Sequence, residues 1–124
     1  MPVISEFQDD VFVVRVVGDY GFNEYVETVL RGFSDPRFNT TTPVLVDSRE
    51  SMASPSSSDL RSICGRILGR RPAGHVGRWA AVTSSAPLRF GIARMGGLTM
   101  ESLGLEVQVF MDIATALAYL RKPE

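Results

Sequence analysis

Residues 11–33, VFVVRVVGDYGFNEYVETVLRGF, contain the clearest structural signals of the sequence. The first seven of these residues are almost all β-branched or aromatic, which is typical of a strand covered on both faces. Gly18 and Gly21 then interrupt this run. Beyond them, apolar side chains recur every three or four residues, which predicts an amphipathic helix; they are Phe22, Tyr25, Val26, Val29, Leu30 and Phe33. A buried strand followed by a helix is the basic unit of an α/β sheet.

The same two patterns recur outward from this unit. A strand-like run at residues 3–7 precedes it, and the polar residues 8–10 between the two runs predict a hairpin. Further strands are expected at 43–47, 79–83 and 105–110. Helices are expected to begin near Asp59, to run from Pro87 to about Met95 and resume through Glu101, and to follow Asp112, a good N-cap residue.

The resulting order is β-β-α-β-α-β-α-β-α. Strands that alternate with helices imply right-handed crossovers, so we predict a five-stranded, mostly parallel sheet with an antiparallel N-terminal hairpin at its edge and four helices. No internal repeat or linker is visible, and residues 1–124 are expected to form a single domain.

Composition limits the function classes. The chain is 44% hydrophobic and 22% charged, as expected of a globular protein. Its apolar runs are too short to span a bilayer, and its acidic start does not resemble a signal peptide, so we expect a cytoplasmic protein without stable membrane insertion. Cys64 is the only cysteine, which excludes an intramolecular disulfide and a cysteine-based zinc site.

Charge is unevenly distributed although the net charge is only -1. Residues 60–100 carry seven arginines and no acidic residue. A genome rich in G and C produces the same excess of arginine, and the overall charge does not favour a nucleic-acid partner. We therefore expect no nucleic-acid binding.

The ending, VQVFMDIATALAYL at residues 107–120, carries a family resemblance, supported by the opening hairpin and the VLVD strand at residues 44–47. A strand that ends in Phe110, an acidic cap at Asp112 and a Tyr119-Leu120 close resemble the SpoIIAA-like (STAS) proteins. This fold is shared by anti-anti-sigma factors and the lipid-binding CRAL-TRIO domain. The resemblance covers essentially the whole chain and implies a small bacterial regulatory protein.

Ser56, Ser57 and Ser58 allow two interpretations. The resemblance implies a phosphorylatable serine at the start of the helix after the third strand, and these serines lie at that place. The sequence departs from the family's Asp-Ser-Ser-Gly-like turn, because about ten residues separate Asp47-Ser48 from Leu60. The alternative is structural: Ser57 or Ser58 caps a helix that begins near Asp59.

A candidate anion-binding site lies at the predicted carboxyl edge of the sheet. In open α/β sheets ligands bind beyond the carboxyl ends of the strands, and TSSAPLR (residues 83–89) follows a strand and opens a helix. The candidate ligand-binding residues are Asp47, Ser48, Thr83, Ser84, Ser85, Arg89 and Phe90. A capped helix with a solvated arginine explains the same residues without a ligand.

Other polar residues give weaker signals. His75, the only histidine, lies in the loop PAGHVG and is expected to be exposed. A single histidine and no metal-ligand spacing predict no metal site, and no nucleophile–base pair indicates a catalytic site. Gly65 and Gly69 are expected to mark close helix packing.

The helix expected at residues 86–101 is apolar on more than one face. Such a helix is buried, covers a pocket or contacts a partner, and the Gly96-Gly97 pair offers a bend or hinge. The leading hypothesis is a non-enzymatic regulatory or protein-interaction module without cofactor, bound to a protein partner or to a second copy as a homodimer. The alternative is a carrier or sensor of a small apolar or anionic ligand, with its pocket under this helix.

Overall fold

The first two strands form the predicted hairpin. The structure of the chain, a computed structural model, describes residues 2–122. Strands β1 (Val3–Gln8) and β2 (Val11–Gly18) pair antiparallel. Asp9, in the two-residue turn, has a φ of 55°, the left-handed conformation that tight hairpins require.

The remaining strands extend the sheet in parallel. Strands β3 (Val44–Ser51), β4 (Trp79–Val82) and β5 (Val107–Phe110) follow β2 in the order β1-β2-β3-β4-β5. Each of the pairs β2/β3, β3/β4 and β4/β5 is parallel. The predicted fold class is therefore confirmed. Strand β3 is longer than predicted, because its last residues continue to pair with β2 past an irregularity between Arg15 and Val17.

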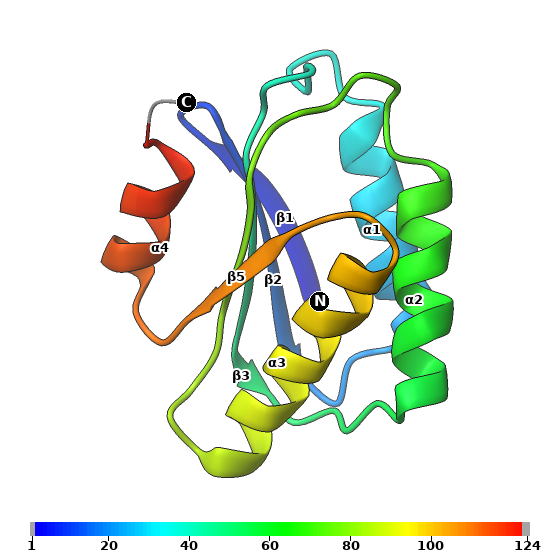
Figure 1. Ribbon diagram of the computed structural model, residues 1–124, viewed down its shortest axis with the longest axis vertical. Coiled ribbons are helices and arrows are strands. Elements are labelled where there is room, and N and C mark those ends of the chain that lie inside the picture. Colours follow the sequence, from blue (N-terminus) through cyan, green and yellow to red (C-terminus); the bar gives the residue numbers. More distant parts are fainter. Residues whose placement is uncertain (1, 123–124) are drawn as a thin grey trace.

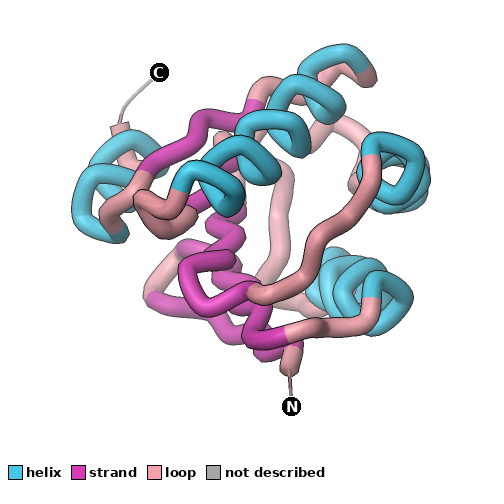
Figure 2. Tube along the Cα trace, turned by 90° about the horizontal axis from the view of Figure 1, so that it is seen from below, coloured by secondary structure: helices cyan, strands magenta, loops and turns pink. Residues whose placement is uncertain are grey.

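The helices form two unequal layers around the sheet (Figure 1). Helices α1 (Phe22–Phe33), α2 (Ser57–Gly69) and α3 (Pro87–Ser102) cover one face, and α4 (Ile113–Leu120) covers the other. The view from below shows the strands between α4, which lies near the C label, and the other helices (Figure 2).

Each layer has its own apolar core. The larger core lies between the sheet and α1–α3 and includes Phe12, Val26, Ile67 and Trp79. The smaller one lies under α4, where Ala116 and Leu120 pack against Val11, Leu45 and Val82. Alternate residues of the central strands thus face opposite layers, as the nearly continuous apolar run of β2 predicts.

Several sequence expectations need correction at the level of single elements. Helix α3 is continuous from Pro87 to Ser102, so Gly96-Gly97 does not interrupt it. Gly65 and Gly69 mark no close packing, because a Cβ atom on either would meet no atom within 4 Å. The close approach is at Gly32, where a Cβ would lie 2.0 Å from Cζ of Phe12.

Candidate functional site

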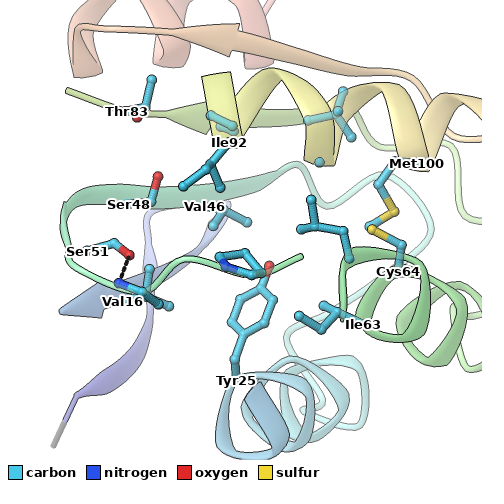
Figure 3. A pocket seen from close by; sticks show the side chains of 18 of the residues that line it. Val16, Tyr25, Val46, Ser48, Ser51, Ile63, Cys64, Thr83, Ile92 and Met100 are labelled. Atoms are coloured by element: carbon cyan, nitrogen blue, oxygen red, sulfur yellow. Dashed lines mark hydrogen bonds between the residues drawn. The ribbon is translucent and has the colours of Figure 1, made fainter. Parts of the chain in front are cut away.

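A cavity of about 130 Å³ lies between the sheet and the three-helix layer. Helix α3 contributes Ile92 and Met100 to its wall, α2 contributes Ile63 and Cys64, and the sheet contributes Val16 and Val46 (Figure 3). These side chains are apolar because they belong to the inner faces of amphipathic elements. The cavity is therefore part of the larger core that is left unfilled, and it lies directly beneath α3.

Polar side chains line the cavity where the strands end. Thr83 follows β4 and is 1% exposed, and Ser48 follows Asp47, the last residue of β3 that pairs with β4. The Ser48 hydroxyl donates to the carbonyl oxygen of Val82 at 3.0 Å, which joins β3 to the end of β4. Ser51 accepts from the backbone N–H of Ala53 at 3.3 Å (Figure 3). The carboxyl edge of the sheet thus supplies hydroxyl groups to one side of an apolar space.

Among the described residues, Arg89 is the only cation in the cavity wall. It lies in the first turn of α3 and donates hydrogen bonds to the backbone carbonyl oxygens of Met52 and Ala53. These bonds tie the loop after β3 to the start of α3. Within residues 2–122, Arg89 forms no ion pair with a carboxylate. It is a positive charge next to an apolar cavity, with two neutral partners.

Two aromatic residues, Tyr25 and Trp79, also line the cavity. The Tyr25 side chain points from α1 into the cavity (Figure 3), and its hydroxyl makes no hydrogen bond within the described residues. Burial raises the pKa of Tyr25, so its hydroxyl remains a neutral donor. Trp79 is 2% exposed, and its indole N–H is buried without a hydrogen-bond partner in the described part of the chain. Unpartnered buried donors are rare in native structures.

Tyr20 completes the aromatic part of the wall. Its ring contacts that of Tyr25 at a centroid distance of 5.8 Å. Burial raises the pKa of Tyr20, and the positive charge of Arg89 opposes this shift.

Cys64 faces the cavity from α2. Its sulfur lies opposite that of Met100 on α3 (Figure 3). Burial raises the pKa of the Cys64 thiol to about 11, so it is protonated at neutral pH and a poor nucleophile.

The structure brings together three of the residues expected to bind a ligand, namely Ser48, Thr83 and Arg89. The others lie elsewhere. Asp47 points to the opposite face of the sheet, where both its carboxylate oxygens accept from Arg49, at 3.0 and 2.9 Å. Ser84 and Ser85 are outside the cavity wall, and Phe90 lines a separate depression between α3 and β5.

The serine cluster is a helix start, but its capping residue differs from the prediction. Ser56 is the N-cap of α2, one residue before Ser57 and two before Ser58, the predicted caps. Its hydroxyl oxygen accepts from the backbone N–H of Asp59 at 3.0 Å, and the Asp59 carboxylate accepts from the Ser56 N–H at 2.9 Å. Ser57 and Ser58 are exposed on the first turn.

The expectation of an exposed His75 is wrong. The side chain is 2% exposed, stacks on Phe38 at a centroid distance of 5.1 Å and bonds through Nε2 to the carbonyl oxygen of Thr42 at 2.8 Å. Arg71 donates to the His75 carbonyl oxygen at 2.7 Å and fixes the loop around it. No group of three or more potential metal ligands occurs among the described residues.

Sequence reasoning missed Tyr20, Tyr25 and Trp79 as parts of the site. Tyr25 and Trp79 sit at core positions of their elements, and periodicity alone gives them a packing role. Only the three-dimensional arrangement shows that all three side chains line one cavity.

Of the comparisons with known proteins, only the one with solved structures bears on the architecture. No family model matches the sequence, and no curated protein matches it. Among solved structures, an anti-sigma factor antagonist from Mycobacterium paratuberculosis superposes with a TM-score of 0.66 over 97% of this chain and 93% of that chain. The chain has the fold of an anti-sigma factor antagonist. Sequence identity is 16%, so the similarity is one of fold.

None of the helices in residues 2–122 combines the length and the apolar character that a membrane-spanning helix needs.

Proposed function

We propose that the protein is a non-enzymatic regulatory module that acts by binding another protein. The full-length similarity to an anti-sigma factor antagonist supports this assignment and suggests an anti-sigma factor as the partner. The fold has a suitable place for such contacts at the carboxyl edge of the sheet, where long loops and helix starts meet.

The observation that carries the proposal is a pair of exposed apolar side chains at this edge. Met52 is 67% exposed and Leu88 is 62% exposed. They come from segments far apart in the sequence, which Arg89 joins through its hydrogen bonds to the carbonyl oxygens of Met52 and Ala53. We call these two side chains the Met52–Leu88 surface. Exposed apolar side chains that are held in place favour contact with a partner.

The start of α2 provides a means of regulation close to this surface in sequence. Ser57 and Ser58 are exposed and lie five and six residues after Met52. A phosphate on either would add nearly two negative charges. Ser56 is the least suitable acceptor, because its hydroxyl is engaged in the cap with Asp59.

Titration with purified anti-sigma factors from the same genome tests the proposal. The wild-type protein is expected to form a complex of micromolar affinity or tighter, and Met52→Glu and Leu88→Glu are each expected to weaken it about tenfold or more. Val76→Glu is the matched control, since Val76 is 65% exposed but precedes β4, at the opposite edge of the sheet.

Two results would contradict the proposal: no complex with any of these anti-sigma factors, or a complex that Val76→Glu weakens as much as Met52→Glu. Phosphomimetic changes, Ser57→Asp and Ser58→Asp, are expected to lower the affinity, whereas Ser57→Ala and Ser58→Ala keep it.

A further inference from the structure

We propose that the cavity beneath α3 binds a small organic monocarboxylate, with its apolar body inside and its carboxylate at Arg89. This inference concerns a second property of the protein and does not depend on the identity of a protein partner.

The size of the cavity indicates the size of the ligand. Protein interiors are close-packed, and voids larger than a water molecule are few. A dry cavity of about 150 Å³ lined by aliphatic and aromatic side chains accepts benzene. The cavity here is about 130 Å³, and half of its lining residues are valine, isoleucine, leucine, alanine or methionine. It therefore suits an apolar body of about six carbon atoms.

The Tyr25 hydroxyl shows that this space is not lined by apolar groups alone. It points into the cavity and makes no hydrogen bond with any other described residue. A purely apolar wall would place phenylalanine at this position. A ligand that carries acceptor oxygens would give this donor a partner.

The charge of the wall selects an anion. Within residues 2–122, Arg89 is the only charged residue of the wall, which contains no aspartate or glutamate. Two of the guanidinium's five N–H donors are used by the Met52 and Ala53 carbonyls, so others remain for a carboxylate. The N-terminal turn of α3 adds a partial positive charge at the same place. Ser48 and Thr83 supply hydroxyl groups beside it.

The balance of apolar and charged surface favours a carboxylate over a phosphate ester. A single cation neutralises one negative charge, and the rest of the wall would leave a second charge without a partner. A monocarboxylate with an aliphatic or aromatic body satisfies both parts of the wall.

Trp79 provides the readout, since it is the only tryptophan and lines the cavity. The probes are a series of straight-chain carboxylates from butanoate to decanoate, with benzoate, and hexanamide as the neutral comparator. We expect saturable changes in tryptophan fluorescence with hexanoate and benzoate, an optimum near six carbons, and binding of hexanamide about tenfold weaker or more. No saturable change with any acid, or equal binding of hexanoate and hexanamide, would overturn the proposal.

Three variants locate the binding. Ala93→Leu, which fills the cavity from α3, is expected to abolish hexanoate binding. Arg89→Met is expected to weaken hexanoate about tenfold or more and hexanamide less than about twofold. Arg94→Met is the control, because Arg94 is an exposed arginine of the same helix outside the cavity wall. Equal loss in Arg89→Met and Arg94→Met would show binding to surface charge instead and would overturn the proposal.

Arg89→Met also removes the hydrogen bonds to the loop after β3, so its folding is monitored by circular dichroism. Thr83→Val changes one hydroxyl without affecting that loop and keeps the test valid if Arg89→Met unfolds. It is expected to weaken hexanoate severalfold, and unchanged affinity in a folded Thr83→Val protein would count against the placement of the carboxylate.

Discussion

At the scale of single residues, His75 links the fold to pH. Burial lowers its pKa below the usual 6.5, and the nearby positive charge of Arg71 acts in the same direction, while the hydrogen bond to the Thr42 carbonyl opposes it. The native state therefore binds its proton less readily than the unfolded chain does. The contribution of His75 to stability is complete above about pH 6.5 and is lost as the pH falls from there through the lowered native pKa.

Urea unfolding between pH 5 and pH 7.5 measures this effect. We expect the free energy of unfolding to fall below pH 6.5 with a slope no steeper than about 1.4 kcal/mol per pH unit, as one titrating proton allows. His75→Phe keeps the ring stacked on Phe38 and removes the titration, so its stability is expected to vary little over this range. A wild-type stability that is flat from pH 5 to pH 7.5 would contradict the burial of His75.

The mistaken expectation for His75 has a physical cause. The neighbouring proline and glycines are turn residues, which usually lie at the surface. The residues that bury His75 are Phe38 and Thr42, more than thirty positions earlier in the chain. The composition of a short segment carries no information about contacts with residues so far away in the sequence.

Substitution by alanine is expected to change the stability of the protein in opposite directions at Gly32 and Gly65. A Cβ on Gly32 would overlap the ring of Phe12, so Gly32→Ala is expected to destabilise the protein by about 1–3 kcal/mol. A Cβ on Gly65, within α2, meets open space, so Gly65→Ala is expected to stabilise it by about 0.5–1 kcal/mol. The midpoints of thermal or urea unfolding compare the two, and a Gly32→Ala protein as stable as the wild type would refute this packing.

At the scale of elements, α2 depends on its first residues. Ser56→Ala removes the hydroxyl that accepts from Asp59 and is expected to cost about 1 kcal/mol of stability. Ser57 makes no such bond, and Ser57→Ala is expected to change stability by a few tenths of a kcal/mol at most. Chemical denaturation measures both, and equal losses in the two variants would argue against the cap.

The elements themselves were predictable because their signals are local. The apolar periodicity of α1, the β-branched run of β2 and the aspartate cap of α4 each lie within one short window. The residues at which the strands and helices end were less predictable. Strand β3 continues to Ser51 only because β2 pairs with its polar end, and α3 continues through Gly96-Gly97 because Gly97 fits against β5.

At the scale of the whole molecule, the order of strands and helices was enough to predict the sheet. Right-handed crossovers leave few arrangements for this order. The candidate site was only partly predictable. The carboxyl-edge rule found Ser48, Thr83 and Arg89, but it also selected Asp47, whose side chain points to the other face of the sheet.

The facing sulfurs of Cys64 and Met100 have a consequence for how often the molecule opens (Figure 3). An aromatic disulfide reagent reacts only with an accessible thiolate, and Cys64 is both buried and shifted to a pKa of about 11. We expect its labelling at pH 8 to be at least a thousandfold slower than in the urea-unfolded chain, on the order set by rare opening events. Labelling at the unfolded rate would show that α2 and α3 do not enclose the thiol. Because the sequence has a single cysteine, the rate reports the exposure of this one thiol.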